Sequence, residues 1–223
     1  MTWLKAQLHL HVKGDKIDNV KPSAKEFIHE AARLNYDILC ITCHDKMIFR
    51  KEDQRFAEKN NIVLLPGIEK TIEKAHVLII NAHPESEFIE TFEDLKIYKK
   101  DHKESIIIAP HPYFKMGNCL GKNLKKHAEL FDAIELCHFK SKLVDFNKKA
   151  IKFANKKNLP LIATADAHYL EALKYGYTFL HPKSYSLEGI LEAIRSGFNH
   201  NYLQEFSTLE LIKLYKKLQK SIK

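Results

Sequence analysis

The feature of this sequence that most constrains its fold is a repeated alternation of short apolar runs with amphipathic helical segments. The apolar runs occupy residues 6–12, 36–42, 62–69, 75–81, 105–110, 132–137 and 159–165. Helical periodicity fills most of the intervals, at residues 23–35, 51–60, 91–101, 124–131, 146–158 and 186–197. Strands that alternate with helices favour parallel pairing in an α/β fold. We therefore predict an irregular (β/α)7 TIM-like barrel, in which the runs at 62–69 and 75–81 pair with each other.

The last segment of the chain, residues 206–223, is also amphipathic. A length of 223 residues with 45% hydrophobic residues suits one domain with a full core. We expect the barrel over residues 1–200 and a C-terminal amphipathic helix within 201–223, packed on the barrel or on a partner. Ser23 is the expected N-cap of the helix at residues 23–35. Gly197 is the expected C′ residue of the helix at residues 186–197.

Composition limits the class of partner. No apolar run approaches the ~20 residues of a membrane span, and the N-terminus does not resemble a signal peptide. We therefore expect a cytoplasmic protein with no membrane partner. The net charge of +8, from 36 Lys and Arg against 28 Asp and Glu, favours an anionic partner. That partner is a phosphorylated small molecule, a nucleotide or nucleic acid; a lysine-rich solvated surface is the alternative reading.

Two histidines stand two residues apart in the first apolar run, "LHLHVKGD". On a strand, residues i and i+2 point to the same side, so His9 and His11 project together. Paired imidazoles suit a divalent metal ion, although two buried histidines with hydrogen-bond partners would give the same pattern.

Further polar residues follow or end the other apolar runs, where a barrel enzyme builds its active site. These residues are His44, Glu69, His111, Glu135, His138, Asp166 and His168. Imidazole and carboxylate ligands suit Zn²⁺, Mn²⁺ or Fe²⁺. The candidates exceed the four or so ligands that one ion needs, so we predict two or three metal ions per chain with a bridging carboxylate. We expect metal-activated hydroxide to be the nucleophile and no separate catalytic side chain.

The cysteines allow a second reading. Cys40 and Cys43 have the C-x-x-C spacing of redox and zinc sites, but a second such pair is absent. The pair lies in an apolar run rather than at a helix start, so we predict that Cys40 packs in the core, and the role of Cys43 stays open.

Taken in order, these motifs resemble the PHP family (polymerase and histidinol phosphatase). The matching segments are "HLHVKGD", "ITCHD", "PGIEK" with "AHVLI", "APHPYF", "IELCH" and "TADAH", spread over residues 5 to about 198. The resemblance implies a metal-dependent phosphoesterase on a seven-stranded barrel.

The resemblance also implies three ligand sets. They are His9, His11, Glu69 and Asp166 for the first metal, Glu69 with His111 and His138 for the second, and Asp15, His44 and His168 for the third. The chain departs from the family pattern at Cys43, which replaces the usual Asp. Asp18 could also exchange roles with Asp15, because the segment after His11 is about one residue short.

Substrate contacts are the least determined part of the site. His76, Lys115, Lys140 and Lys142 are candidates for binding a substrate phosphate, and His76 could equally be a ligand or support one. His83, in "NAHPES", imitates the Ala-His-Pro motif, but we expect it to be structural or superficial.

The predicted function is hydrolysis of a phosphomonoester or a nucleotide-type phosphodiester. The alternatives are a nuclease or other nucleic-acid-processing protein, a non-catalytic barrel subunit of a larger complex, and an amidohydrolase. Lys70 does not stand convincingly where an amidohydrolase would place a bridging lysine.

Overall fold

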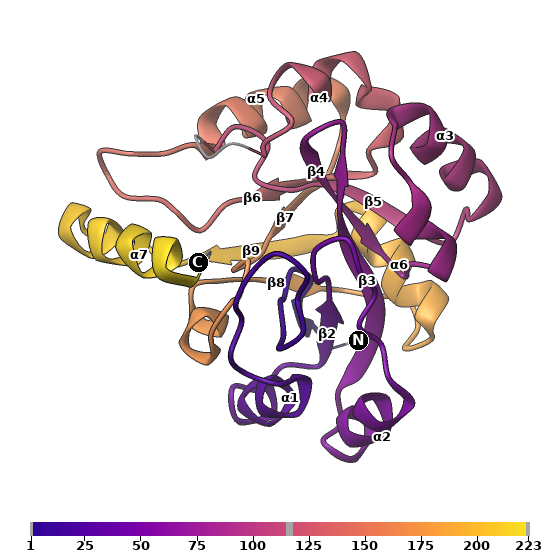
Figure 1. Cartoon of the computed structure of the whole chain (residues 1–223), viewed down its shortest axis with the longest axis vertical. Coiled ribbons are helices and arrows are strands. Elements are labelled where there is room, and N and C mark those ends of the chain that lie inside the picture. The colour runs from indigo at the N-terminus through magenta and orange to yellow at the C-terminus, as the bar shows by residue number, and fades with distance from the viewer. Residues whose placement is uncertain (1, 115–117, 222–223) are drawn as a thin grey trace.

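The fold is a strongly curved mixed sheet surrounded by helices (Figure 1). The computed structural model describes residues 2–114 and 118–221, with the side chains of 218–221 left out of the description. The strands in these residues are β1 Leu4–Gln7, β2 Ile38–Ile41, β3 Val63–Ile72, β4 Ala75–Ile80, β5 Ile106–Ala109, β6 Ala133–Leu136, β7 Leu161–Ala163, β8 Gly176–Leu180 and β9 Asn199–Leu203. Their order in the sheet is β7-β6-β5-β4-β3-β2-β1-β8-β9. The prediction of an α/β barrel-like sheet is confirmed.

The strand pairing is less regular than a (β/α)7 barrel. β1–β2–β3 and β5–β6–β7 pair in parallel, whereas β4 is antiparallel to both of its neighbours. The predicted β3–β4 hairpin is present, and its turn residues Glu73 and Lys74 both have positive φ, as in a type I′ turn. β8 and β9 add an antiparallel pair beside β1 that the sequence pattern did not predict.

The sheet closes in different ways at the top and at the bottom of the barrel. After β1 and β7 the chain continues in a parallel bridge between Leu10 and Ala167, so these segments adjoin directly. Toward the start of β1, β8 and β9 lie between β1 and β7. There the Ala163 N–H donates to Thr178 Oγ1 and to Asn201 Oδ1, at 2.9 and 2.7 Å. Side chains therefore complete much of the closure that backbone pairing leaves open.

The helices cover the outside of the sheet. They are α1 Ala24–Arg33, α2 Lys51–Lys59, α3 Phe92–Asp101, α4 Lys122–Lys126, α5 Asn147–Lys157, α6 Leu187–Ser196 and α7 Thr208–Ser221, with 3₁₀ turns η1 Pro84–Phe88, η2 Ala128–Leu130 and η3 Leu170–Lys174. Ser23 caps α1 in a capping box with Glu26, and Gly197 ends α6 in the left-handed conformation, both as predicted.

Strand residues alternate between two apolar layers, as the two-residue period of a strand requires. On β5, Ile106 and Ile108 join an inner cluster that includes Leu8, whereas Ile107 and Ala109 pack with the outer helices. This alternation fixes which way each strand end points, and therefore where the polar residues after the strands project.

The C-terminal helix α7 packs through its first turns. Leu211 and Leu214 are buried against Cys137 and Phe206, which belong to the loops after β6 and β9. Figure 1 shows α7 projecting from the side of the barrel, away from α3 and α6. Among the described residues, none of the helices combines the length and the apolar character that crossing a membrane would need.

Candidate metal centre

Backbone pairing beyond the strand ends brings the predicted polar residues together. The His11 N–H donates to Ala167 O at 2.9 Å, and the Ala167 N–H donates to His9 O at 3.1 Å. A parallel bridge likewise pairs His44 with Glu69 on β3. These contacts fix the register between the segments that carry the candidate ligands.

Four side-chain atoms converge at the centre of the site: Nε2 of His9, Nε2 of His11, Oε2 of Glu69 and Oδ1 of Asp166. Both imidazole nitrogens lie 3.3 Å from the Glu69 oxygen. They lie 3.3 and 3.2 Å from the Asp166 oxygen, respectively. Asp166 reaches this position from a backbone with φ of 45°, a left-handed conformation that Asp tolerates.

This group fits a divalent metal ion. Ligand atoms about 2.0–2.2 Å from a tetrahedral ion lie roughly 3.4 Å apart, close to the observed separations. His9 Nε2, His11 Nε2 and Asp166 Oδ1 are buried and have no hydrogen-bond partner among the described residues. Buried polar atoms are rarely left unsatisfied, so three such atoms around one point indicate a site for a cation.

Glu69 faces imidazoles with both of its oxygens. Oε2 also lies 3.0 Å from His44 Nε2, while Oε1 lies 2.9 Å from His76 Nδ1 and 3.1 Å from His111 Nε2. The carboxylate is buried and central, as a bridge between two metal ions requires. The His76 Nε2 is 3.0 Å from the side-chain amide nitrogen of Asn118, which can donate to it; His76 then donates from Nδ1 to Glu69.

A buried carboxylate behind the centre orients His9. Glu135 Oε1 accepts a hydrogen bond from His9 Nδ1 at 2.7 Å and one from the Thr164 hydroxyl. Glu135 Oε2 accepts from the His111 backbone N–H at 2.6 Å. A proton on Nδ1 leaves the Nε2 lone pair of His9 free for a metal, as in the carboxylate–histidine–metal arrangement.

Asp15 contacts the Nδ1 atoms of two imidazoles, as Glu135 contacts that of His9. Its Oδ2 is 2.9 Å from His11 Nδ1 and accepts from the His44 N–H at 2.8 Å. Both of its oxygens are 3.1 Å from His44 Nδ1. Asp15 therefore contacts these histidines on the side away from Glu69.

His168 pairs with the other aspartate of the same loop. Its Nε2 lies 2.7 Å from Asp18 Oδ2, and His44 Nδ1 is 3.8 Å from that oxygen. The ring of His168 stacks on that of His11, with centroids 4.2 Å apart. His138 is buried beside Phe139, and its Nδ1 has no partner among the described residues.

The carboxylates control the charge of the histidines. Burial opposes protonation of His9, but the neighbouring carboxylates, Asp166 and Glu69 foremost, outweigh it and raise its pKa to about 10. For His138 burial prevails over the carboxylates and lowers the pKa to about 4. His138 is therefore neutral at pH 7, the form that binds metals.

Other sequence candidates have different surroundings. Cys43 is buried, and its sulfur accepts from the Val12 N–H at 3.3 Å. Burial raises the pKa of the Cys43 thiol to about 12, so it packs as a neutral group. Cys40 is buried in the core, as predicted. Lys70 forms an ion pair with Asp45 at 3.1 Å.

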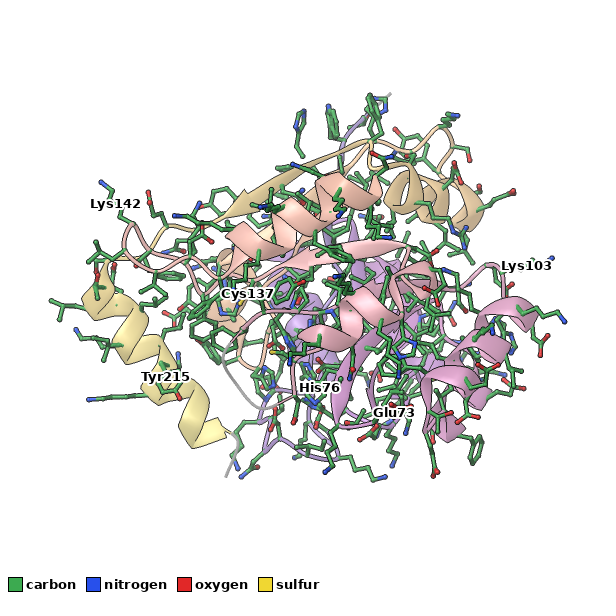
Figure 2. All side chains as sticks on the ribbon, turned by 90° about the horizontal axis from the view of Figure 1, so that it is seen from above. Glu73, His76, Lys103, Cys137, Lys142 and Tyr215 are labelled. Carbon is green, nitrogen blue, oxygen red and sulfur yellow. The ribbon has the colours of Figure 1, made fainter. Side chains whose placement is uncertain are left out.

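The three lysine candidates for phosphate binding differ in their position. Lys115 lies outside the described residues. Figure 2 shows Lys142 at the outer edge of the molecule, far from His76 of the centre. Lys140 is half-buried, and its backbone N–H donates to His138 O at 2.7 Å. A cleft of about 500 Å³ instead lies along the loop of residues 13–21, which carries Lys13 and Lys21 beside Asp15 and Asp18.

The supporting residues differ in how far the sequence indicates them. Glu135 is indicated as a polar residue in an apolar run, but its partners His9 and Thr164 are distant in sequence. Asn118 and Cys119 stand in an irregular loop, where Cys119 Sγ lies 3.5 Å from His111 Nδ1. Only a predicted contact between this loop and the histidines could have identified them.

The site is therefore a histidine- and carboxylate-rich centre at the strand ends of a barrel-like sheet. Residues 145–198 match a family model described as PHP-associated. A search of the curated proteins gives no match to the chain.

Solved structures share the fold. A two-domain protein from Bacteroides vulgatus, containing a predicted PHP-like metal-dependent phosphoesterase, superposes with a TM-score of 0.69 and 21% identity, over 97% of this chain and 70% of that chain. PsfC from Pseudomonas syringae gives 0.68 and 14%, over the full length of both. The lesion-specific endonuclease PfuEndoQ from Pyrococcus furiosus gives 0.60 and 15%, over 96% of this chain and 66% of that chain. The family model matches part of the chain, and these solved structures share its overall fold.

Proposed function

We propose that the chain is a PHP-type metal-dependent phosphoesterase that hydrolyses a phosphomonoester or a nucleotide-type phosphodiester. The observation that carries the proposal is the convergence of His9 Nε2, His11 Nε2, Glu69 Oε2 and Asp166 Oδ1 at 3.2–3.3 Å. The family match and the fold support the same class of enzyme.

The residues divide into proposed ligands and proposed supports. The first ion is held by His9, His11, Glu69 and Asp166, and the second by Glu69 with His111 and His138. His44 and His168 remain for a third ion, with Asp18 as its carboxylate. In this arrangement Asp15 positions His11 and His44, and His76 orients Glu69.

Two or three divalent ions, Mn²⁺, Zn²⁺ or Fe²⁺, would supply Lewis-acid stabilisation of the phosphoryl oxygens and a water of lowered pKa. The protein residues hold the imidazoles in one tautomer, since Glu135 and Asp15 accept from the Nδ1 side. His9, His11 and Glu69 are also buried, which strengthens electrostatic interactions at the centre. A neutral His138 needs to lose no proton before it binds a cation.

The test is metal content and activity measured on one preparation. The wild type, loaded with each metal in turn, is assayed with an aryl phosphate and a nucleotide panel beside His9→Ala and the exposed-histidine control His29→Ala. We expect two or three equivalents of metal and phosphate release in the wild type and the control, with both lost in His9→Ala. A folded, metal-free and inert wild type would instead identify a non-catalytic barrel.

A nuclease is the second candidate. The net charge of +8 and the cleft flanked by Lys13 and Lys21 favour a polyanionic substrate, and the similar structure of PfuEndoQ belongs to an endonuclease. Oligonucleotide cleavage, with binding that weakens steeply as salt rises, would favour this candidate over a small phosphomonoester.

A further inference from the structure

A second cluster of metal-binding side chains lies at the other end of the barrel. It consists of His83, His102 and Glu104, whose ligand atoms lie within 4.8 Å of one another. His83 Nε2 is 2.6 Å from Glu104 Oε1, and His102 Nδ1 is 3.8 Å from the same oxygen. The two imidazole rings stack with centroids 4.4 Å apart.

The topology separates this cluster from the candidate metal centre. β4 is antiparallel to β5, so the end of β4, which leads to His83, pairs with the start of β5 at Ile106. His111 of the centre follows the other end of β5. The strand itself spans roughly 13 Å, at ~3.3 Å per residue. In Figure 2, Lys103, which lies between His102 and Glu104, is at the opposite side of the molecule from Lys142 and well away from His76.

The backbone under the cluster is held in place by hydrogen bonds. The His83 N–H donates to the Tyr98 hydroxyl at 3.0 Å, and the His102 N–H donates to Tyr98 O at 2.9 Å. The Tyr98 hydroxyl also contacts Ser105 Oγ at 3.1 Å. One tyrosine of α3 therefore anchors two residues of the cluster and the neighbouring Ser105, which limits the ordering cost of binding a ligand.

The surroundings of the cluster are accessible and partly acidic. The side chains of His83 and Glu104 are 40% and 48% exposed. A pocket of about 240 Å³ adjoins His102 and is lined by three carboxylates, Glu85, Asp94 and Asp101. A concentration of negative charge raises the local concentration of cations.

We propose that His83, His102 and Glu104 form a peripheral binding site for a borderline transition-metal ion, of which Zn²⁺ is the best fit. Two imidazoles and one carboxylate are a common three-ligand set for Zn²⁺, and a water completes the coordination. The set lacks the several oxygen ligands that Ca²⁺ or Mg²⁺ requires. The site is independent of the proposed function, because no residue of the centre contributes to it.

The experiment counts bound Zn²⁺ by equilibrium dialysis and elemental analysis on the full chain. The variants are His102→Ala, Glu104→Gln and the exposed-histidine control His29→Ala, each in the wild-type background and with Asp166→Asn. We expect each cluster variant to lose one equivalent of Zn²⁺ in both backgrounds. His29→Ala should keep the count of its background.

Co²⁺ gives a second readout, because its visible absorption depends on the coordination number and geometry of the bound ion. We expect the Co²⁺ absorption of the Asp166→Asn protein at saturation to fall by the share of one site on adding His102→Ala. Equal Zn²⁺ counts in the cluster variants and His29→Ala, with an unchanged Co²⁺ spectrum, would overturn the proposal and leave the cluster as a hydrogen-bonded histidine–glutamate pair. His83→Ala, in the same assay, should lose the same equivalent while phosphoesterase activity is unchanged.

Discussion

Glu135→Gln tests whether the carboxylate behind the centre sets the tautomer of His9. Three donors converge on the two Glu135 oxygens: the His9 Nδ1–H, the Thr164 hydroxyl and the His111 N–H. Glutamine has one oxygen and one NH₂, so the amide nitrogen must face either His9 and Thr164 or the His111 N–H. The Thr164 hydroxyl can rotate and accept, but a donor opposite His9 forces the proton to Nε2. If the amide nitrogen faces the His111 N–H instead, two donors oppose each other and the hydrogen bond from the His111 N–H is lost.

The size of the effect follows from either arrangement. Losing a hydrogen bond to a charged acceptor costs about 1.5–3 kcal/mol. At about 1.4 kcal/mol per factor of ten, metal affinity should fall roughly 10- to 100-fold. Substitutions of such supporting carboxylates in other metal sites span the same range.

The assay is competition for Mn²⁺ or Zn²⁺ against a chelating indicator, with Glu129→Gln as the matched control. Glu129 is exposed on the turn before β6, so the same chemical change there should leave affinity unchanged. Circular dichroism checks that Glu135→Gln remains folded. A folded Glu135→Gln protein with the affinity of Glu129→Gln would refute the tautomer argument.

Three further predictions concern the centre and the closure of the barrel. Asp166→Asn should keep the fold, because Asn also tolerates a φ of 45°, but should lower metal affinity by at least ~100-fold; near-normal metal content by elemental analysis would exclude Asp166 as a ligand. Metal uptake should release protons, since carboxylates outweigh burial and raise the pKa of His9 to about 10 in the free protein, so affinity should rise with pH between 6 and 9. Calorimetry in two buffers of different ionisation enthalpy measures this release, and identical heats in both would contradict it. Gly176→Ala should destabilise the fold by about 1–3 kcal/mol, because its Cβ would lie 2.3 Å from Thr164 O; an unchanged urea midpoint would show that β7 and β8 can separate at no cost.

The sequence predicted which residues meet, because position after a strand end is a local property. His9, His11, Glu69 and Asp166 each belong to an apolar run or to the residues just after one. The parallel strands of such a fold deliver them to the same edge. The four apolar residues of β5 are another local property. The two-residue period of a strand is enough to predict that they alternate between the two apolar layers.

What the sequence could not predict depends on contacts between distant side chains. The sequence motif that suggests Asp15 as a ligand does not say which imidazole nitrogens its carboxylate faces. In the structure it faces Nδ1 of His11 and of His44. β9 was missed because its residues are exposed or half-buried and carry no apolar period. The residues of β8 alternate between buried and half-buried. However, β8 pairs antiparallel with β1, which is far away in sequence, and an alternation of helices and strands does not predict such a pairing.

The direct meeting of the segments after β1 and β7 has a mechanical consequence. His9 and His11 follow β1, whereas Asp166 follows β7, six strands away in the sheet order, so an ion held by all three would cross-link these two segments. Such a cross-link joins parts of the chain that are far apart in sequence. Because the site exists only in the folded state, a bound ion would stabilise that state. Hydrogen exchange at Ala163 and Ala167 would then slow more on metal loading than exchange within the β3–β4 hairpin. Bound metal would then stabilise the closed barrel even in the absence of substrate.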